Sequence, residues 1–289
     1  SIELGSGDTT IGNGETDING SSISGGTGRL SVNARNMATS RLLQNDATGG
    51  LDFTLSGKLS DSTLELGVNA GLLTVADAIS NSTIKSTHAG SLTLSAGSVK
   101  NGVITLSGEG EDTLNIGGDL DAKITLGGGA DVINVSGALS GSLKTEADLT
   151  LNAEKISGGN LDLGGANNLL NVSNAIDNSS ISLGDGAATV GAASTNYSNT
   201  AISGGNADNV INGNNYTGGS ITLGDGDNRI NVSGALSAAV SLGAGANTIG
   251  GETTSLHGFS FTGAGSNTIT GKELVNATVH LGAEGQLNQ

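Results

Sequence analysis

Four acidic residues in two neighbouring glycine-rich stretches have the types and spacing of a calcium site. Asp112 and Asp131 each end a Gly-x-Gly-x-Asp pattern, and Glu109 and Glu111 lie within the first of these patterns. Calcium binds carboxylate and backbone carbonyl oxygens, and glycine allows the tight turns that present such carbonyls. Carboxylates stacked about 5 Å apart in successive turns repel one another, and a bound divalent cation would relieve that repulsion.

Both stretches continue with one further residue and an aliphatic residue, and the whole pattern resembles the turn of the RTX calcium-binding repeats. That resemblance implies glycine carbonyls and aspartates that hold calcium between successive turns. It is partial, because RTX repeats carry this turn twice in about 18 residues and here it occurs once per coil. Asn228 replaces the aspartate in a third copy, where Asp225 and Asp227 are a weaker second place for an ion. The alternative is that Asp and Asn are present because they favour turns.

Other residues that could support catalysis are scattered. His88, His257 and His280 are expected to lie in separate coils, and a lone surface histidine is usually solvated. A polysaccharide-cleaving enzyme needs several carboxylates, or calcium with a basic residue, on one outward face. We therefore expect a protein that is not an enzyme, with polysaccharide cleavage as the alternative.

Two sets of polar and aromatic side chains recur at equivalent places. Tyr197 and Tyr216 are expected to stack, and a packing pair that covers a loop is favoured over the alternative of a small glycan-binding ladder. Six asparagines are expected to form amide ladders that hydrogen-bond one coil to the next, rather than a row of ligand-binding amides. These are Asn115, Asn134, Asn152, Asn171, Asn212 and Asn231.

All these residues belong to a repeat of about 20 residues that runs through the chain. Residues 221–242 show it plainly: short aliphatic runs with a period of two are separated by glycine-containing turns. So short a unit cannot bury an apolar face alone, so its copies must stack. We therefore predict an all-β fold, a single parallel β-solenoid of about 14 coils. The residues expected to end a strand before each turn are Leu4, Ser24, Gln44, Leu66, Ser86, Leu106, Leu126, Leu143, Leu163, Leu183, Gly204, Leu223, Leu242, Thr262 and Leu281.

The predicted core is aliphatic, because the chain has 50 glycines and aromatic residues make up only 2% of it. Residues 66–140 and 163–237 form a longer duplication of five coils with a constant offset of 97 residues. Such an offset survives only when whole coils are added, so residues 1–289 are predicted to form one continuous solenoid. Inward positions are expected at Leu114, Ile116, Leu126, Ile133, Val135, Leu163, Leu170, Val172, Leu183, Ile221, Leu223, Ile230, Val232 and Leu242.

Composition limits the partners. Eleven basic and 27 acidic residues give a formal net charge of −16, which argues against binding to nucleic acid or to anionic membranes. No apolar run approaches the length of a spanning helix, so membrane insertion is not expected. The chain has no cysteine and therefore no disulfide or thiol chemistry.

The coil length and the strings Leu-Gly-x-Gly and Val-Ser-Gly-Ala-Leu resemble β-solenoid repeat regions of large bacterial surface and secreted proteins. These include autotransporter passengers, haemagglutinin-like two-partner exoproteins and repeat-built S-layer proteins. The resemblance implies a right-handed solenoid outside the cell or on the bacterial surface, as an adhesin stalk or a matrix or surface-layer subunit. Its partners would be a longer parent chain or other copies of itself, joined end to end, and glycans or cell surfaces. Coils that begin at Leu4 and Leu281, without evident caps, favour a fragment of a longer solenoid over a self-stacking subunit.

Overall fold

The computed structural model describes residues 1–47, 49–68, 70–87 and 89–282, so His88 lies outside the described residues. The chain divides into two compact units, Ser1–Asp148 and Leu149–Gln289, and each is described by itself below. The described residues form strands and turns and contain no helix. Both units are parallel β-solenoids, which confirms the predicted fold class, with about 14 turns in all. The expectation of one continuous solenoid stays a prediction.

The strands are short in most coils and longer where one strand passes round a corner of the coil. The first unit contains β1 (Ile2–Glu3), β2 (Thr9–Ile11), β3 (Ile18–Asn19), β4 (Ser22–Gly25), β5 (Leu30–Ala34), β6 (Met37–Ala38), β7 (Arg41–Ala47), β8 (Leu51–Leu55), β9 (Leu59–Ser60), β10 (Thr63–Val68), β11 (Ala70–Ser80), β12 (Thr83–Ser86), β13 (Ser91–Leu106), β14 (Thr113–Ile116), β15 (Leu120–Leu126) and β16 (Asp131–Lys144). The second contains β17 (Leu149–Ser157), β18 (Asn160–Asp162), β19 (Asn168–Asp177), β20 (Ser180–Ser182), β21 (Ala188–Val190), β22 (Asn196–Ser203), β23 (Val210–Gly213), β24 (Asn215–Leu223), β25 (Arg229–Val232), β26 (Leu236–Leu242), β27 (Asn247–Gly250), β28 (Ser255–His257), β29 (Ser260–Gly263), β30 (Asn267–Thr270), β31 (Glu273–Val275) and β32 (Thr278–Leu281).

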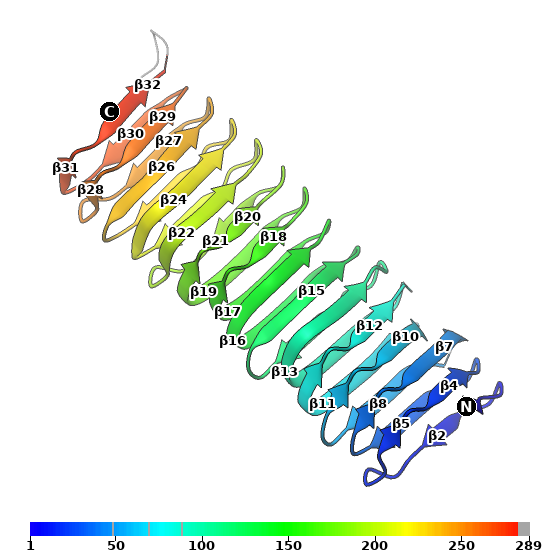
Figure 1. The fold of residues 1–289 in the computed structure, drawn as a ribbon. Helices are drawn as coiled ribbons and strands as arrows, with labels where there is room; N and C mark the ends of the chain where they lie inside the picture. Colours follow the sequence, from blue (N-terminus) through cyan, green and yellow to red (C-terminus); the bar gives the residue numbers. More distant parts are fainter. Residues whose placement is uncertain (48, 69, 88, 283–289) are drawn as a thin grey trace. The chain divides into compact units, whose positions relative to one another are not determined.

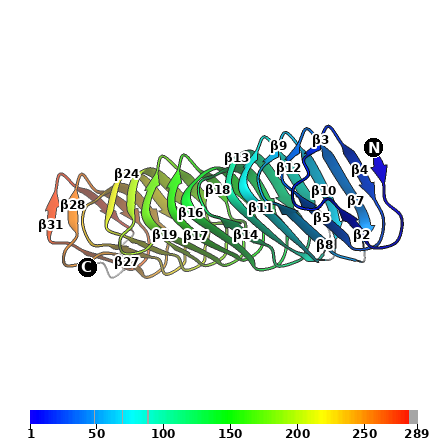
Figure 2. The ribbon, with the colours of Figure 1, turned by 90° about the horizontal axis from the view of Figure 1, so that it is seen from below.

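Each coil of the first unit has three faces, and each face pairs in parallel with the same face of the next coil. Face 1 leads into the glycine-rich turn and runs through β1, β4, β7, β10 and β12. Face 2 follows the turn and runs through β2, β5, β8 and β11. Face 3 runs through β3, β6 and β9. The strands of face 2 follow one another in Figure 1, and Figure 2 shows β3 and β9 along a different side from β2 and β8.

The second unit repeats this arrangement. Its face 1 runs through β18, β20, β22, β24, β26, β29 and β32, with every neighbouring pair parallel. Its face 2 runs through β17, β19, β21, β23, β25, β27 and β30. One copy of the 97-residue duplication, residues 66–140, lies in the first unit, and the other, 163–237, lies in the second.

The core follows from the period of two along each strand. Leu64, Ile84, Ile104 and Ile124 occupy one register position in four successive coils, and each is buried. Stacked aliphatic side chains of this kind bury apolar surface that a single coil would leave exposed. All fourteen residues predicted to point inward are at most 5% exposed, so the predicted core is confirmed.

Three of the predicted strand ends are wrong. The register places Gly25 at the position assigned to Ser24, Thr145 at that assigned to Leu143, and Gly263 at that assigned to Thr262. Leu143 and Thr145 are both buried and lie two residues apart, so both side chains point inward. The aliphatic Leu143 fits the predicted pattern better than Thr145 does, although Thr145 occupies the position at the end of the strand. Gly25 and Gly263 take the place of large side chains because a neighbouring residue, Leu4 and Phe261 respectively, fills the space where their Cβ would lie.

A second polar ladder, which we did not predict, lines the corner between faces 3 and 1. Buried Ser40, Ser62 and Ser82 follow one another in successive coils. The Ser40 N–H donates to Ser62 Oγ at 3.1 Å, and the Ser62 N–H donates to Ser82 Oγ at 3.2 Å. Each of these hydroxyls donates in turn to the carbonyl two residues earlier. The residue before Ser82, Asn81, has φ 48°, and asparagine tolerates this left-handed conformation better than most residues do.

Candidate functional site

The glycine-rich turns between faces 1 and 2 hold the aspartates singled out in the sequence. Asp112 lies just before β14 and Asp131 begins β16, and these residues are 4% and 1% exposed. The Leu92 N–H donates to Asp112 Oδ1 at 2.7 Å, and the Asp112 N–H donates to Asp131 Oδ1 at 2.8 Å. The two side chains therefore point into the coil and link three successive turns.

The second unit has asparagines at the same place, and they show what this position does. The Asn209 N–H donates to Asn228 Oδ1 at 3.2 Å, as the Asp112 N–H does to Asp131. Asn228 Nδ2 then donates to the carbonyls of Gly226 at 2.7 Å and Gly224 at 3.2 Å. The inward amide thus satisfies its own turn and the turn of the preceding coil at once.

Asp131 cannot complete this pattern, because it has a second oxygen where Asn228 has an NH₂ group. Asp131 Oδ2 is buried and has no hydrogen-bond partner. An unpaired buried acceptor of this kind is costly, and a bound cation or proton would relieve the cost. The inward aspartates therefore suit the ion that the RTX resemblance implies, with Asp112 and Asp131 as the carboxylate ligands.

The two glutamates predicted to assist calcium lie elsewhere. Glu109 and Glu111 are exposed on the outside of the same turn, so they do not share the inward position of Asp112 and Asp131. In the described residues no three His, Asp or Glu side chains are grouped closely enough to hold a metal ion. Calcium at Asp112 and Asp131 stays a prediction, and any such ion would depend on backbone carbonyls for most of its ligands.

Asp225 and Asp227, the weaker second place, are exposed and already engaged. Asp225 Oδ1 accepts the Ala244 N–H at 2.9 Å, and Asp227 Oδ1 accepts the Ala246 N–H at 2.7 Å. These carboxylates cap backbone groups of the next coil. Their role in stacking explains their presence without an ion.

A cavity of about 450 Å³ opens beside the Asp131 turn. Its charged lining residues are Glu109, Lys144 and Glu146, and Lys144 Nζ lies 3.3 Å from Glu146 Oε1. Gly127 and Gly128 of the turn form another part of its wall. The cavity borders the outside of the turn, and its lining does not include Asp112 or Asp131.

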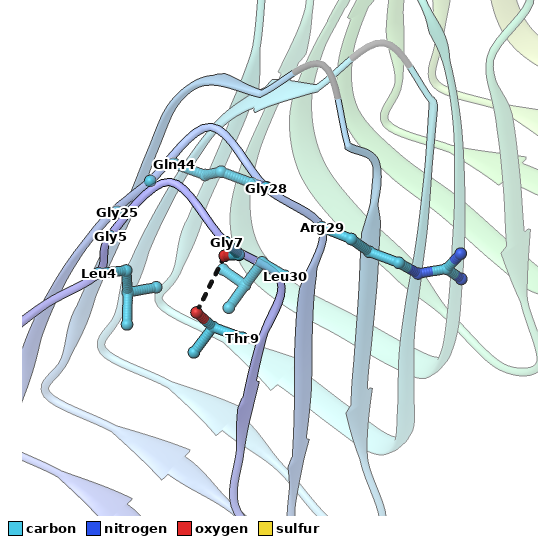
Figure 3. A pocket seen from close by; sticks show the side chains of 10 residues that line it. Leu4, Gly5, Gly7, Thr9, Gly25, Gly28, Arg29, Leu30 and Gln44 are labelled. Carbon is cyan, nitrogen blue, oxygen red and sulfur yellow. Dashed lines mark hydrogen bonds between the residues drawn. The ribbon is translucent and has the colours of Figure 1, made fainter.

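The turn edge near the start of the chain carries a smaller space. A cavity of about 10 Å³ is lined by Leu4, Thr9, Leu30 and Gln44, among others (Figure 3). Gln44 is buried, and its Oε1 has no hydrogen-bond partner. Figure 3 shows Arg29 extending away from this space. The volume suits about one water molecule.

The predicted asparagine ladders are confirmed. Asn134 Nδ2 donates to Asn115 Oδ1 at 2.8 Å in the first unit. In the second unit Asn231 Nδ2 donates to Asn212 Oδ1 at 2.9 Å, and Asn171 and Asn152 are joined in the same way at 2.8 Å. These amides bond one coil to the next along face 2, so they are structural.

The predicted tyrosine pair is confirmed as packing, and a glycan-binding platform made of these rings is excluded. Tyr197 and Tyr216 are stacked with ring centroids 4.7 Å apart and are 1% and 0% exposed. The Tyr197 hydroxyl donates to Asn212 O at 2.8 Å, and the Tyr216 hydroxyl donates to Thr200 O at 2.8 Å. A sugar cannot stack on rings that lie inside the coil.

One cluster of residue types used by hydrolases was missed in the sequence. Ser255 Oγ donates to Glu273 Oε1 at 2.7 Å and lies 3.3 Å from His257 Nδ1. The carboxylate contacts the hydroxyl rather than the imidazole, so it does not orient a histidine base as the acid of a catalytic triad does. All the contacts are exposed, and His280 is exposed too.

Comparisons with known proteins found no relative of the chain. No protein-family model matches the chain, and no curated protein or solved structure matches it either. Among the described residues there is no helix long and apolar enough to cross a membrane.

The position of Asp131 predicts a pH effect on stability. Burial raises the pKa of Asp131 to about 6; the Asp112 N–H lowers it, and the charges of Asp112 and Glu111 raise it further. In the unfolded chain the pKa returns to about 3.9, so the folded state binds the proton more tightly. This contribution is full below about pH 4 and is lost as the pH rises through about 6.

Urea unfolding of the wild type and Asp131→Asn across this range measures the effect. As the pH rises, we expect the wild type to lose about 1 to 2 kcal/mol of unfolding free energy relative to Asp131→Asn. Asp77→Asn, at an exposed position of the same unit, should leave the pH dependence of the wild type unchanged. Equal pH slopes for the wild type and Asp131→Asn would contradict the prediction.

Proposed function

We propose that the chain is a structural element of a bacterial protein outside the cell, an adhesin stalk or a subunit of a matrix or surface layer. The observation that carries this proposal is that recurring polar side chains bond one coil to the next. Asn115 and Asn134 do so on face 2, Ser62 and Ser82 at a corner, and Asn228 inside a turn. These polar side chains are thereby used in hydrogen bonds between coils. Such bonding suits a load-bearing or scaffolding role.

The extracellular location is part of the same proposal and is supported by chemistry and resemblance. The chain lacks cysteine and carries a net charge of −16, which keeps a long solenoid soluble and separated from anionic surfaces. The coil length and turn strings resemble those of bacterial surface and secreted repeat proteins. Glycans, cell surfaces or neighbouring chains would be its partners.

The outermost strands of the two units supply a route to assembly. In the described pairings β1 pairs only with β4, and β32 pairs only with β29. Among the described residues each of these strands has one edge with no partner strand, and Ile2 and Leu281 are 45% and 46% exposed. A free edge is a template for another strand. Either a neighbouring coil of a longer protein or a second copy of the chain would cover it.

Charging these strands tests assembly through the free edges. The double variant Ile2→Lys with Val279→Lys should reduce self-association measured by sedimentation and electron microscopy, because lysine side chains on an edge repel an incoming strand. Its unfolding midpoint should stay close to that of the wild type, since the inner coils keep both neighbours.

The matched control is Val103→Lys with Leu169→Lys, which adds the same charge at one exposed apolar site in each unit, 37% and 38% exposed. We expect this control to self-associate like the wild type. A wild type that stays monomeric at high concentration, or a control that loses association equally, would show that the edges do not join copies.

A calcium-stabilised surface protein is a second candidate, favoured by the unpartnered Asp131 Oδ2. Calorimetry with millimolar calcium should then show binding that Asp131→Asn weakens, and chelation should lower the melting temperature of the wild type. If calorimetry shows no calcium binding and chelation leaves the melting temperature unchanged, calcium does not contribute to the stability of the protein.

A further inference from the structure

Face 1 of the first unit carries a patch of positive charge, although the chain as a whole is strongly acidic. Beyond β12 this face continues through the second half of β13, then β15 and the end of β16. In these four coils none of the outward residues of face 1 is acidic, and three are exposed lysines. The eight outward residues are Thr83, Lys85, Val103, Thr105, Lys123, Thr125, Ser142 and Lys144. We call Lys85, Lys123 and Lys144 the lysine strip.

The lysine strip is largely unpaired within the unit. In the part of the chain that the structure describes, two of its lysines form no ion pair, and the third, Lys144, lies 3.3 Å from Glu146 of the adjacent turn. Glu65 is the neighbour of Lys85 in the register, but its Oε2 is 3.0 Å from Arg41 Nη2. The strip therefore has ammonium groups free to meet carboxylates from outside the unit.

The glycine-rich turns of the second unit carry the opposite charge. Four exposed aspartates lie on three successive turns, and we call them the aspartate row: Asp185, Asp208, Asp225 and Asp227. In the last three of these, Oδ1 accepts a backbone N–H of the next coil, at 2.7, 2.9 and 2.7 Å. A carboxylate held in this way is already ordered, so it loses little freedom when a cationic group binds to it.

The second unit has few basic residues that could neutralise the aspartate row. Its only three are Lys155, Arg229 and Lys272. Lys155 Nζ lies 2.7 Å from Asp177 Oδ2, and Arg229 Nε donates to Asn231 Oδ1 at 2.6 Å. Among the described residues no aspartate of the row forms an ion pair.

The two surfaces repeat with the same period, because both are built from stacked coils about 4.8 Å apart. Lys85 and Lys123 lie two coils apart, as do Asp185 and Asp225. The flexible lysine side chains can span the sideways offset between columns. Charges farther apart than about 8 Å are largely screened at physiological ionic strength, so the net charge of −16 does not outweigh ion pairs in contact.

We propose that the lysine strip of one copy of the chain docks on the aspartate row of a second copy. The strip and the row are different surfaces, so the contact is heterologous and can be repeated from copy to copy. It does not involve the free strand edges of β1 and β32. The inference rests on the proposed function as a matrix or surface-layer subunit, to which it adds a lateral contact between subunits.

Carbodiimide crosslinking of a mixed sample tests the contact directly, because this reagent joins only a lysine and a carboxylate that touch. Isotope-labelled and unlabelled wild-type chains are mixed in equal amounts, and crosslinked peptides are identified by mass spectrometry. We expect peptides with one labelled and one unlabelled partner that join the lysine strip to the aspartate row. Raising the salt concentration from about 0.15 M to about 1 M should reduce their yield about tenfold, because the Debye length falls.

Reversing the charge of the strip should break the contact. In Lys85→Glu with Lys123→Glu, Lys144 remains as the reporter, and we expect its crosslinks to the aspartate row to fall about tenfold. The matched control is Lys58→Glu with Lys100→Glu, which makes the same change of charge at exposed lysines of the same unit outside face 1. The control should give the wild-type yield.

Neutralising the row tests the other side of the contact without disturbing the turns. Asp225→Asn with Asp227→Asn keeps oxygens that can accept the N–H groups of the next coil, as Asn206 Oδ1 already does at 3.1 Å. Crosslinks from the strip to the remaining two aspartates of the row should fall about fivefold. Asp61→Asn with Asp77→Asn, at exposed positions of the first unit, removes the same charge and should have no effect.

The proposal is overturned if the strip and the row give no crosslink between labelled and unlabelled chains, or if either variant matches its control. If alginate protects the strip lysines from acetylation in a sample without such crosslinks, the strip binds an acidic polysaccharide instead. Any of these results leaves the proposed structural role intact, because assembly through the strand edges is tested separately by the Ile2 and Val279 variants.

Discussion

Replacement of Tyr197 by alanine is expected to lower the free energy of unfolding of the second unit by about 3 to 5 kcal/mol. The ring is 1% exposed and stacks on Tyr216 with centroids 4.7 Å apart, so its removal leaves a cavity that the stacked coils cannot easily close. The hydroxyl also donates to Asn212 O at 2.8 Å and to Val190 O at 3.2 Å. Both carbonyls lose that donor in the variant.

Urea unfolding followed by circular dichroism measures the loss, and Tyr197→Phe separates its two parts. The phenylalanine variant keeps the ring stack and loses only the hydroxyl, so we expect a loss of about 1 to 2 kcal/mol. An alanine variant within about 1 kcal/mol of the wild type would mean that the stack contributes little to the stability of the unit.

Gly184→Ala is expected to be at least as damaging, by more than about 4 kcal/mol, and to prevent normal stacking of the turn. Gly184 has φ 67°, where a side chain is strained, and its Cβ would overlap the Gly164 carbonyl oxygen of the neighbouring coil. The carbonyl belongs to the backbone and cannot move aside without breaking the register of the coil.

Gly165→Ala is the matched control, because a Cβ at Gly165 meets nothing within 4 Å. Soluble yield, circular dichroism and urea unfolding should show a nearly normal Gly165→Ala protein and a strongly destabilised Gly184→Ala protein. If the two variants unfold at the same urea concentration, the close contact between these turns does not limit stability.

The fold could be predicted from the sequence because the coil repeats. A strand or turn that is ambiguous in one coil can be recognised from the same position in the other coils. The predicted inward residues are buried because a period of two leaves only two choices of face. Three strand ends were predicted wrongly, at Gly25, Thr145 and Gly263. At the two glycines the space is filled by the side chains of Leu4 and Phe261, which a local sequence pattern does not reveal.

The candidate site was predicted in part. The spacing of Asp112 and Asp131 predicted that both lie in glycine-rich turns, but a carboxylate in such a turn can point either way, and both proved to be buried. Ser62 and its neighbours in the ladder were missed because a lone serine before a strand is usual in an exposed turn. The contact between Ser255 and Glu273 was missed because it joins residues 18 positions apart, which only the exact coil length brings together.

The duplication has a genetic consequence. Leu66 and Leu163 both lie where face 1 leads into the glycine-rich turn, and they are 97 residues apart. Unequal crossing-over between the two gene segments would therefore delete or add five whole coils while the reading frame and the inward pattern continue across the joint. Gene conversion over a shorter tract would exchange residues 112–131 for 209–228 and replace both aspartates by asparagines in one event. The gene can thus change the inward residues of these turns by copying from itself, without waiting for separate point mutations.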